Sequence, residues 1–433
     1  MGLKSVNIDV HHITRVEGHG NIVVDMQNGS LKKVEWQVPE APRFFEAMVV
    51  GRDCRELAHI TSRICGICSI GHTFASLKAT EAALGITVTD QARRLREILL
   101  HAENLQSHLL HVCYLVLPDL LRVDSVLSLI DTRREVVLLA TRLHRLANET
   151  CDIVGGRTTH PVRACINGWT VLPENKQLAK LRKRHVEAID DLKTLADFVG
   201  ANSSGFPRFE RETEYVSLTH PDEYALYDGS ITSSDTGEQM PPTEYERVAN
   251  EYVTPQSTAK WAKFNRDAYF VGALARYNNN HPKLTGLSKS VAADLGLSAP
   301  CYNPFMNSVA QVVECVFSVE MIISHIDRLL DKGLREEKTD FDVCEGRGVG
   351  SVEVPRGILF HDYTYNRKGK CVKANCVIPT NQNHANIQLD MEKLVPEFKD
   401  RGKEELQFLL EMLVRAYDPC ISCSTHCLDI SFE

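Results

Sequence analysis

Two Cys-x-x-Cys pairs stand near opposite ends of this 433-residue chain, and they constrain its fold more than any other feature. The first pair is Cys65 and Cys68, and the second is Cys420 and Cys423. In each pair two residues separate the thiols, so the intervening turn can bring both sulfur atoms to the same side of the backbone. For the two pairs to face one centre, the whole chain must fold around them.

The spacing alone does not decide what these four cysteines bind or do. With fourteen cysteines in the chain, one coincidental pair would be unsurprising. A structural zinc site is the next alternative, but zinc modules usually bring their two pairs within a few tens of residues. A thioredoxin-like redox pair needs one motif after a strand, not two motifs. Four soft thiolates suit nickel, iron or copper(I) as well as zinc, so ligand type does not choose the metal.

The composition is that of an ordinary globular protein, with 43% hydrophobic and 24% charged residues and a formal net charge of -8. This mildly acidic balance argues against broad nucleic-acid binding. No stretch approaches about 18 consecutive apolar residues, so we expect no membrane span. The first residues lack the layout of a secretory signal, and a cytoplasmic, reducing location is the expectation.

Hydrophobic periodicity predicts a mainly α protein with minor β structure (α+β), organised as one domain over residues 1–433. Its core is expected to be a bundle of long helices within residues 91–200, with small peripheral β-sheets. Residues 6–38 are predicted to form an N-terminal β region. Residues 201–260 are polar and aromatic, and predict a surface excursion of loops with a short strand or two. Helices are expected over 91–117, 121–154, 178–199, 307–332 and 403–416, and strands within 343–380.

Further motifs lie between the cysteine pairs and around them. In chain order they are Arg15–His19, Phe45-Glu46, Gly51-Arg52, Arg63–Cys68 with His72, Leu117–Asp119, Gly155–Pro161, Glu353–Gly357 with His361, Ile378–Thr380 and Asp418–His426. Taken together and in this order, the motifs make the chain resemble the large, catalytic subunit of nickel–iron hydrogenases over nearly its full length. The resemblance implies the large-subunit fold of that family and reversible cleavage of H2.

The resemblance is to the cytoplasmic, multisubunit branch of the family, because the chain is short and both cysteine pairs are intact. That branch passes electrons to NAD(P), a deazaflavin or ferredoxin. The resemblance assigns Cys65 and Cys420 as terminal ligands of nickel. It assigns Cys68 and Cys423 as bridges between nickel and an iron that carries CO and CN ligands.

Four more residues receive catalytic roles from the resemblance. Arg356 is expected above the open metal position, held by Asp119 and Asp418; without the motif, a structural ion pair would be the commoner role. Glu17 resembles the first proton relay, beside Cys420. A carboxylate can relay protons only if its pKa lies near the working pH, which partial burial favours. Considered alone, Glu17 would be interpreted as a loop or helix cap.

Pro355 and Pro379 are expected, by resemblance, to form apolar walls on the iron side, and Thr380 to hydrogen-bond a cyanide nitrogen. His72 is expected to fix a thiolate by a hydrogen bond. A buried histidine satisfied by the core is an equally good account of His72.

A magnesium or similar divalent cation is also implied by the resemblance. Its ligands would be Glu46, His426 and the carbonyl oxygen of Ile378. Carboxylate and water are ordinary magnesium ligands, whereas a histidine is less usual. Without the family resemblance, Glu46 would be interpreted as an exposed glutamate on a helix face.

The last residues, 427–433, resemble the C-terminal extension that a maturation endopeptidase removes in most of the family. No motif in the chain binds an iron–sulfur cluster, a flavin or a nucleotide. The resemblance therefore implies an obligate partner, the family's iron–sulfur small subunit, with diaphorase-type flavin and iron–sulfur subunits beyond it. Residues 40–75 and 155–170 are the expected contact surface.

Three functions remain open from the sequence. The first is the catalytic subunit of a hydrogenase. The second is an H2-sensing regulatory subunit on the same scaffold. The third is a zinc-stabilised structural subunit of a larger redox complex, which predicts zinc and no diatomic ligands.

Overall fold

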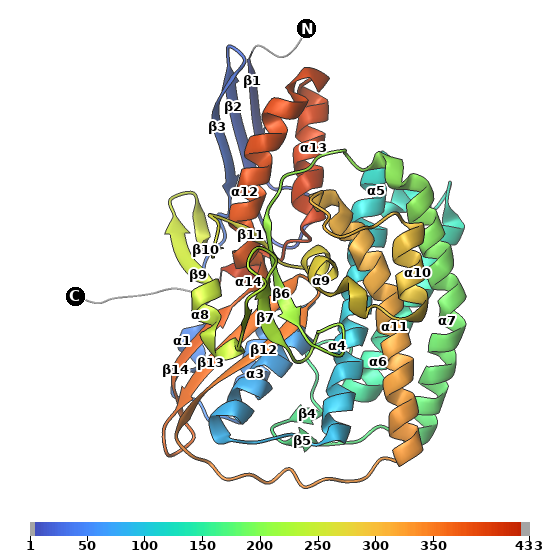
Figure 1. Cartoon of the computed structure of the whole chain (residues 1–433), viewed down its shortest axis with the longest axis vertical. Helices are drawn as coiled ribbons and strands as arrows, with labels where there is room; N and C mark the ends of the chain where they lie inside the picture. Colours follow the sequence, from blue (N-terminus) through green and yellow to red (C-terminus); the bar gives the residue numbers. More distant parts are fainter. Residues whose placement is uncertain (1–4, 426–433) are drawn as a thin grey trace, which may run out of the picture.

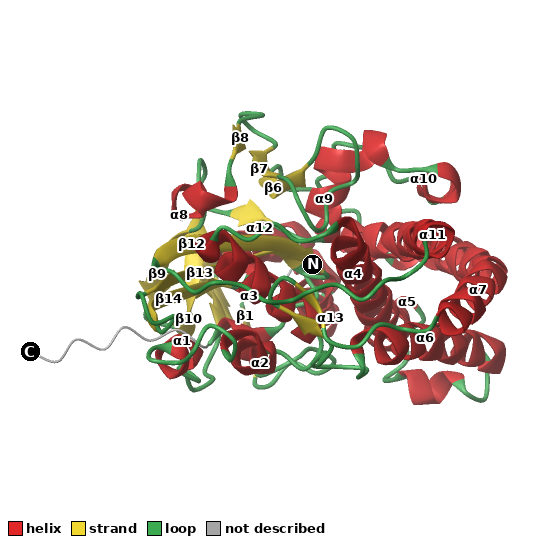
Figure 2. Cartoon of the chain, turned by 90° about the horizontal axis from the view of Figure 1, so that it is seen from below, coloured by secondary structure: helices red, strands yellow, loops and turns green. Residues whose placement is uncertain are grey.

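The protein has two sides, a bundle of long helices and a β-rich region, shown by a computed structural model that describes residues 5–425. Figure 1 shows the bundle on the right and the sheets on the left, and Figure 2 shows the same division from below. The predicted mainly α fold with small peripheral sheets is confirmed. The division matters for the site, because the cysteine pairs lie on the β-rich side.

The bundle consists of α4 (Asp90–Leu110), α6 (Arg134–Gly155), α7 (Asn175–Asn202) and α11 (Asn307–Lys332). Helix α4 packs against α6 and α11, and α7 packs against the same two helices. The apolar residues of α4 recur at helical spacing and are buried, which is why the predicted bundle forms. The helix expected over 121–154 begins only at Arg134, after a short 3-10 turn.

The helix expected to run to residue 117 changes character before its end. Helix α4 stops at Leu110, and a π-helical segment (His111–Val116) leads into α5 (Leu117–Leu120). Pro118 lies at the start of α5, where the missing N–H costs least. The change of helix type places Asp119 at the start of a new helix.

Helix α11 is the most apolar of the bundle. Among residues 5–425, the segment Pro304–Lys332 is the one helix long and apolar enough to cross a membrane, judged by length and composition. In its most apolar window 78% of the residues are buried within the protein. That burial is typical of the core helix of a bundle.

A three-stranded antiparallel sheet carries the first cysteine pair indirectly, through a helix. The sheet consists of β12 (Gly346–Val354), β13 (Gly357–Tyr365) and β14 (Cys371–Val377), and α3 (Ser69–Leu84) packs across it. Three alternate glycines of β12 face the backbone of α3, and a Cβ on any of them would collide with it. This close packing fixes α3, and with it the cysteine turn that precedes α3.

The N-terminal β region forms as predicted, with β1 (Val6–Val10), β2 (Asn21–Gln27) and β3 (Ser30–Gln37) in one antiparallel sheet. Helix α12 (Pro379–Phe398) packs on β3, and α13 (Lys403–Ala416) packs on α12. Helix α12 was not predicted from the sequence pattern. Its first turns are rich in buried asparagine and glutamine rather than apolar residues, so they show no clear apolar stripe.

Residues 201–260, expected as a surface excursion, are mostly exposed or half-buried, but one of their strands lies in the interior. The segment forms β6 (Glu214–Thr219), β7 (Ser230–Ser233), β8 (Gln239–Met240), β9 (Asn250–Thr254) and β10 (Ser257–Lys263). Strand β6 is buried for nearly all its length. Its polar side chains are satisfied internally: the buried Glu214 accepts hydrogen bonds from Ser233 Oγ at 2.6 Å and Asn265 Nδ2 at 2.8 Å. The polar composition of β6 therefore does not mean that the strand is exposed to solvent.

The remaining elements are short. They are α1 (Phe45–Val49), α2 (Leu57–Thr61), β4 (Ala164–Cys165), β5 (Gly168–Trp169), α8 (Tyr245–Val248), β11 (Tyr269–Phe270), α9 (Ala273–Asn280), α10 (Gly286–Asp294) and α14 (Ile421–Ser424), with 3-10 turns between several of them.

Candidate metal centre

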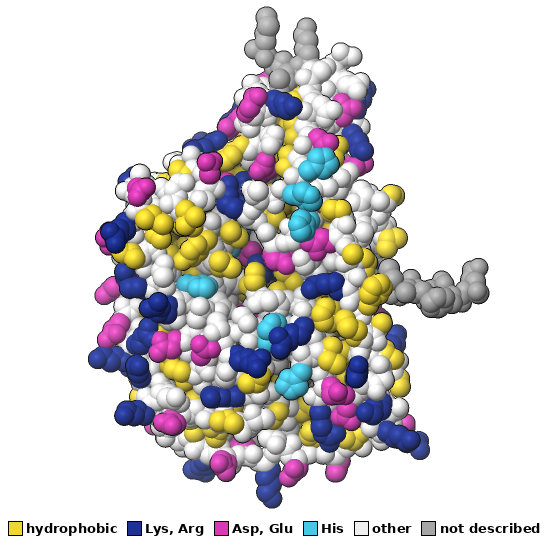
Figure 3. Space-filling view, turned by 180° about the vertical axis from the view of Figure 1, so that it is seen from behind, with side chains coloured by type: hydrophobic (Ala, Val, Ile, Leu, Met, Phe, Trp, Pro, Cys, Tyr) yellow, Lys and Arg dark blue, Asp and Glu magenta, His cyan; other side chains and the backbone are white. Residues whose placement is uncertain are grey.

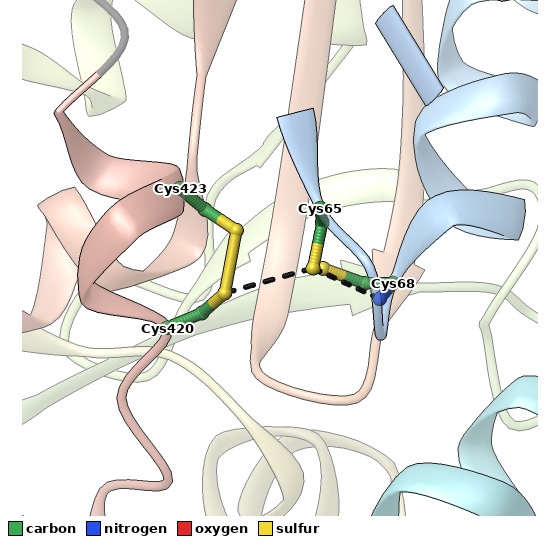
Figure 4. Close-up of side chains that lie close together, drawn as sticks. All are labelled: Cys65, Cys68, Cys420 and Cys423. Carbon is green, nitrogen blue, oxygen red and sulfur yellow. Dashed lines mark hydrogen bonds between the residues drawn. A yellow bond between two sulfur atoms is a disulfide. The ribbon is translucent and has the colours of Figure 1, made fainter. Parts of the chain in front are cut away.

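The two cysteine pairs meet in the interior, as the spacing requires for a common centre. The Sγ atoms of Cys65, Cys68, Cys420 and Cys423 all lie within 4.8 Å of one another, and all four residues are buried. Figure 4 shows the pairs approaching from two separate segments, with Cys65 Sγ 3.6 Å from Cys420 Sγ. Cys420 and Cys423 are joined as a disulfide in this structure.

The first pair forms a tight turn at the start of α3. Cys65 ends a 3-10 turn, and Cys68 is the residue immediately before α3. The backbone N–H groups of Ile67 and Cys68 donate to Cys65 Sγ at 3.3 and 3.0 Å. Burial raises the pKa of the Cys65 thiol, but the hydrogen bond from Cys68 and the charge of Arg356 outweigh burial and bring the pKa below its usual value. The turn is thus built to hold a thiolate.

Glu103, from α4, holds the same turn from behind. Its carboxylate accepts hydrogen bonds from the backbone N–H groups of Ile70 at 2.7 Å and Gly71 at 3.0 Å. These are first-turn N–H groups of α3, which have no partner within the helix. Glu103 is fully buried, and burial raises the pKa of its carboxyl well above the usual value. Glu103 was not predicted from the sequence, because a glutamate on a buried helix face gives no motif.

The second pair is held mainly by residues far away in the sequence. The backbone N–H of Cys420 donates to Thr380 Oγ1 at 3.0 Å. The N–H of Ile421 donates to the carbonyl of Glu17 at 2.9 Å, and the N–H of Ser422 donates to Glu17 Oε2 at 3.1 Å. Glu17, the expected proton relay, therefore lies against the second cysteine turn and is half-buried. Thr380 lies at the same turn.

Arg43 contacts both cysteine turns. Its guanidinium donates to the carbonyl of Ile64, just before the first pair, at 2.7 Å, and to the carbonyl of Ser422, inside the second pair. Its backbone N–H donates to the carbonyl of Thr425 at 2.8 Å. Arg43 was also not predicted from the sequence; its position just before the Phe45-Glu46 motif is the only signal that could have drawn attention to it.

Arg356 lies beside the sulfur cluster and is held by Asp418. Its Nε donates to the carbonyl of Asp418 at 2.6 Å, and one Nη donates to the carboxylate at 2.9 Å. Gln311 Nε2 donates to the other carboxylate oxygen at 3.1 Å. Burial opposes the charge, but Asp418 and the thiols of Cys68 and Cys65 raise the pKa of Arg356 above its usual value. Within residues 5–425 the other Nη of Arg356 has no hydrogen-bond partner, although it is buried.

The expectation that Asp119 also holds Arg356 is wrong. Asp119 accepts hydrogen bonds from Arg15 at 2.5 Å and from Arg415 at 2.7 and 3.0 Å. The reason is the break after α4, because α5 directs Asp119 toward the N-terminal segment and α13. Asp119 therefore ties the chain around Glu17 to α13, and Asp418 alone of the two contacts Arg356.

The expected magnesium ligands are only partly described. Glu46 Oε1 accepts a hydrogen bond from the backbone N–H of Cys376 at 2.7 Å. The carbonyl of Ile378 accepts one from Gln382 Nε2 at 3.3 Å. His426 and the extension 427–433 lie outside the described residues. The magnesium site stays a prediction.

The structure describes the remaining expected residues, His72, Pro355 and Pro379, but does not test their roles. His72 Nδ1 is 3.1 Å from His361 Nε2, so the two imidazoles share a hydrogen bond. Pro355 forms the turn between β12 and β13, and Pro379 begins α12. The walls and the thiolate contact expected of these residues stay predictions.

The donor set fits a soft transition metal. Four buried sulfur atoms converge, and a buried arginine Nη beside them lacks a protein partner in residues 5–425. Sulfur donors select metals such as nickel, iron, copper(I) or zinc over magnesium or calcium. An unpartnered buried N–H is costly unless another group accepts from it. A metal centre with hydrogen-bond acceptors of its own would satisfy both observations.

Family profiles and related sequences match most of the chain. The sequence profile described as nickel-dependent hydrogenase matches residues 43–138 and 216–426, and one described as HoxL-like matches residues 7–41. The alpha chain of sulfhydrogenase 1 from Pyrococcus furiosus is 32% identical in an alignment of 429 positions that covers 97% of each chain. An F420-non-reducing hydrogenase chain from Methanothermobacter marburgensis is 30% identical, covering 98% of this chain and 95% of the relative.

Solved structures agree. An NAD+-reducing NiFe hydrogenase in its H2-reduced state superposes with a TM-score of 0.87 at 26% identity, covering 98% of this chain and 100% of that chain. The NiFeSe hydrogenase of Dm. baculatum superposes with a TM-score of 0.76 at 22% identity, covering 98% of this chain and 100% of that chain, which shows likeness of fold alone.

Proposed function

The chain belongs to the nickel-dependent hydrogenase family as a large, catalytic subunit, and on this premise we propose that it cleaves H2 heterolytically and reversibly into two protons and two electrons. The observation that carries the proposal is the meeting of four buried cysteine sulfurs from opposite ends of the chain. Thiolates that hold nickel and iron together would supply a site where H2 binds and is polarised. The carbonyl and cyanide ligands of iron belong to this proposal.

Cys65 and Cys420 are proposed as terminal ligands of nickel, and Cys68 and Cys423 as bridges to iron. The first turn supports this because two backbone N–H groups stabilise a thiolate at Cys65. Cys420 and Cys423 must be reduced to act as thiolates. Asp418 holds the guanidinium of Arg356 beside the cluster, so its positive charge and the Nη that has no partner in residues 5–425 would stabilise negative charge developing there.

Glu17 is proposed as the group that accepts and passes on the proton. One carboxylate oxygen accepts from the N–H of Ser422, so the side chain is fixed next to the cysteine turn. Its partial exposure gives it access toward solvent. A fixed carboxylate at hydrogen-bond reach is what proton transfer needs.

The electrons must leave through a partner, because the chain carries no motif for an iron–sulfur cluster or flavin. We propose an iron–sulfur small subunit, with diaphorase-type subunits passing electrons to NAD(P) or ferredoxin. The relatives named F420-non-reducing weigh against a deazaflavin acceptor, and the structural relative named NAD+-reducing favours NAD(P).

The expected contact segments, 40–75 and 155–170, expose apolar residues that suit such a partner. They are Phe44, Met48, Val50 and Val162. Figure 3 shows hydrophobic side chains gathered in patches on the back face of the molecule. Exposed apolar patches mark protein–protein contacts. A cytoplasmic location and removal of residues 427–433 by an endopeptidase belong to the same proposal.

Infrared spectroscopy with metal analysis of the purified complex tests the central proposal. Carbonyl and cyanide stretches, together with nickel and iron, are expected. Zinc with a silent spectrum, in a chain whose extension has been removed, would contradict the proposal and restore the zinc-stabilised structural alternative. The H2-sensing alternative differs in rate: it predicts the same spectrum with very slow turnover.

Replacing Glu17 tests the proton relay. Glu17→Gln keeps a carbonyl oxygen that can accept from the N–H of Ser422 but cannot carry the proton, so turnover should fall by about 100-fold or more. Nickel and iron content should stay at the wild-type level. The measurements are H2 oxidation, hydrogen–deuterium exchange of the gas, and metal analysis. Full activity in a metal-replete variant would remove Glu17 from the proton path.

A further inference from the structure

Arg276, on α9, is a fully buried residue outside the motifs and outside the metal centre. All five of its N–H groups have acceptors. Nε and one Nη donate to the two carboxylate oxygens of Glu314 at 2.7 and 2.6 Å. The second N–H of that Nη donates to the carbonyl of Pro355 at 3.0 Å. The other Nη donates to Glu353 Oε2 at 2.9 Å and to the carbonyl of Val354 at 2.8 Å.

Three of these five bonds end on consecutive residues, 353–355, and the next residue is Arg356. This stretch is the end of β12 and the turn into β13. The turn is closely packed against the start of α9: Gly357 has φ +134, and a Cβ there would collide with Val271 and press on the N–H of Gly272. The turn that projects Arg356 toward the cysteines is therefore fixed by α9.

The far side of Arg276 is anchored in the helix bundle. Glu314 lies on α11, and its carboxylate also contacts His108 Nε2 at 2.7 Å and accepts from Tyr224 Oη at 2.7 Å. Glu353 accepts in addition from the backbone N–H of Leu218 at 2.7 Å. Arg276 thus joins the rigid bundle to the hairpin that carries Arg356.

We propose that Arg276 is a positioning residue for H2 cleavage, which fixes the backbone at Val354-Pro355 so that Arg356 is held beside the cysteine sulfurs. A planar guanidinium with five fixed donors can serve two carboxylates and two carbonyls at once, whereas a lysine ammonium has three donors on a flexible stem. The inference rests on the proposed role of Arg356. A displacement of about 1 Å in a reacting group can lower a rate by about 100-fold.

Arg276→Lys in the assembled complex is the test, and the chain offers a matched control. Arg96 is another fully buried arginine, bound bidentately by Glu81 at 2.6 and 2.8 Å, with further acceptors in Tyr227 and the carbonyl of Cys165. Arg96→Lys breaks an equally buried network that contacts neither the turn nor Arg356. Arg356→Lys serves as the reference for loss of the positioned group itself.

Both Arg276→Lys and Arg96→Lys should lower the melting temperature. Only Arg276→Lys should also lower kcat for H2 oxidation, by about 10- to 100-fold at unchanged nickel and iron content and similar KM. Its carbonyl and cyanide bands should shift, and amide hydrogen exchange in residues 353–362 should speed up. Arg96→Lys should keep kcat within about twofold of wild type.

Equal kcat in the metal-replete Arg276→Lys and Arg96→Lys complexes, or unchanged exchange at residues 353–362, would overturn the positioning role. Wild-type turnover in Arg356→Lys would instead overturn the proposed role of Arg356, so the two failures are distinct. Should Arg276→Lys not assemble, Glu353→Gln takes its place. It keeps an acceptor for Leu218 but turns an amide donor toward Arg276, and a smaller fall in kcat with the same band shift is expected. No fall and no shift would overturn the inference.

Discussion

The two cysteine pairs have the same spacing but are supported in opposite ways. The first pair immediately precedes a 16-residue helix whose packing on β12 leaves no room for a side chain at the glycines of that strand. The second pair lies at a four-residue helix, with Cys420 just before it and Cys423 within it, at the end of the described chain. Its backbone is held by hydrogen bonds to Glu17, Thr380 and Arg43, which lie far away in the sequence.

The two pairs therefore depend on different parts of the chain for their position. The first pair is held by the core, through α3 and through Glu103 of α4. The second pair takes its position only when the N-terminal segment, α12 and the C-terminal segment have come together. The second turn should therefore be the less stable of the two, because local stability differs between regions of one fold.

Losing a sulfur should have the largest effect, and the same effect in both pairs. Cys65→Ser and Cys420→Ser should each leave turnover below about 0.1% of wild type. This loss is larger than the 10- to 100-fold loss typical when a residue that hydrogen-bonds to a metal ligand is replaced. Nickel content and H2 oxidation are the measurements. Cys113→Ala, at a buried cysteine outside the motifs, is the control and should stay active. Substantial activity in either serine variant would remove that cysteine from the ligand set.

Removing Arg43 should loosen the second pair more than the first, because the first turn is also held by Glu103 and by the packing of α3. Arg43→Gln loses the donors to Ile64 and Ser422, so metal affinity should fall by about 10- to 100-fold. Amide hydrogen exchange should speed up more in residues 418–424 than in residues 64–72. Arg55→Gln, at an exposed ion pair, is the control. Equal loosening of both turns would contradict the comparison.

Removing Glu103 should do the reverse, and with a smaller effect. Glu103→Ala leaves the buried N–H groups of Ile70 and Gly71 without an acceptor, which should lower the free energy of unfolding by about 1–3 kcal/mol. Glu103→Gln keeps an acceptor oxygen and should lose less. Thermal unfolding and amide exchange in residues 69–73 are the measurements. If alanine and glutamine behave alike, Glu103 does not hold the first turn by these bonds.

The sequence predicted the helices and strands in which apolar residues recur at regular spacing. The helices of the bundle, the N-terminal sheet and α13 follow from periodicity, and the meeting of both cysteine pairs follows from their spacing and the resemblance. Prediction failed where polar residues are buried. Helix α12 begins with a run of buried amides, and β6 is buried although it is polar, because both are satisfied by partners that no local pattern reveals.

The site shows the same limit. Asp119 and Asp418 both belong to motifs, and nothing in the sequence says which one contacts Arg356. The choice depends on the π-helical break before α5, a tertiary feature. Glu103, Arg43 and Arg276 hold backbone groups, and backbone acceptors and donors leave no signature in a sequence.

The smallest expected effect concerns His384, which supports the second pair through Ser424. Trp36 Nε1 donates to His384 Nδ1 at 2.9 Å, so the proton of the neutral ring lies on Nε2, 3.1 Å from Ser424 Oγ. Burial lowers the pKa of His384 from 6.5 to about 3. Between those values the unfolded chain binds a proton that the folded protein does not. The contribution of the neutral His384 to the free energy of unfolding is therefore complete above pH 6.5 and is lost as the pH falls toward 3.

By about pH 5.5 the loss due to His384 should reach about 1.4 kcal/mol. His384→Gln keeps an acceptor for Trp36 and a donor for Ser424 but does not titrate, so its stability should fall less between about pH 7 and 5.5. The other buried histidines titrate equally in both proteins and cancel in the difference. Urea unfolding at the two pH values measures it. If wild type and His384→Gln lose the same free energy of unfolding between the two pH values, His384 takes up a proton in the folded protein as well. The prediction would then be wrong.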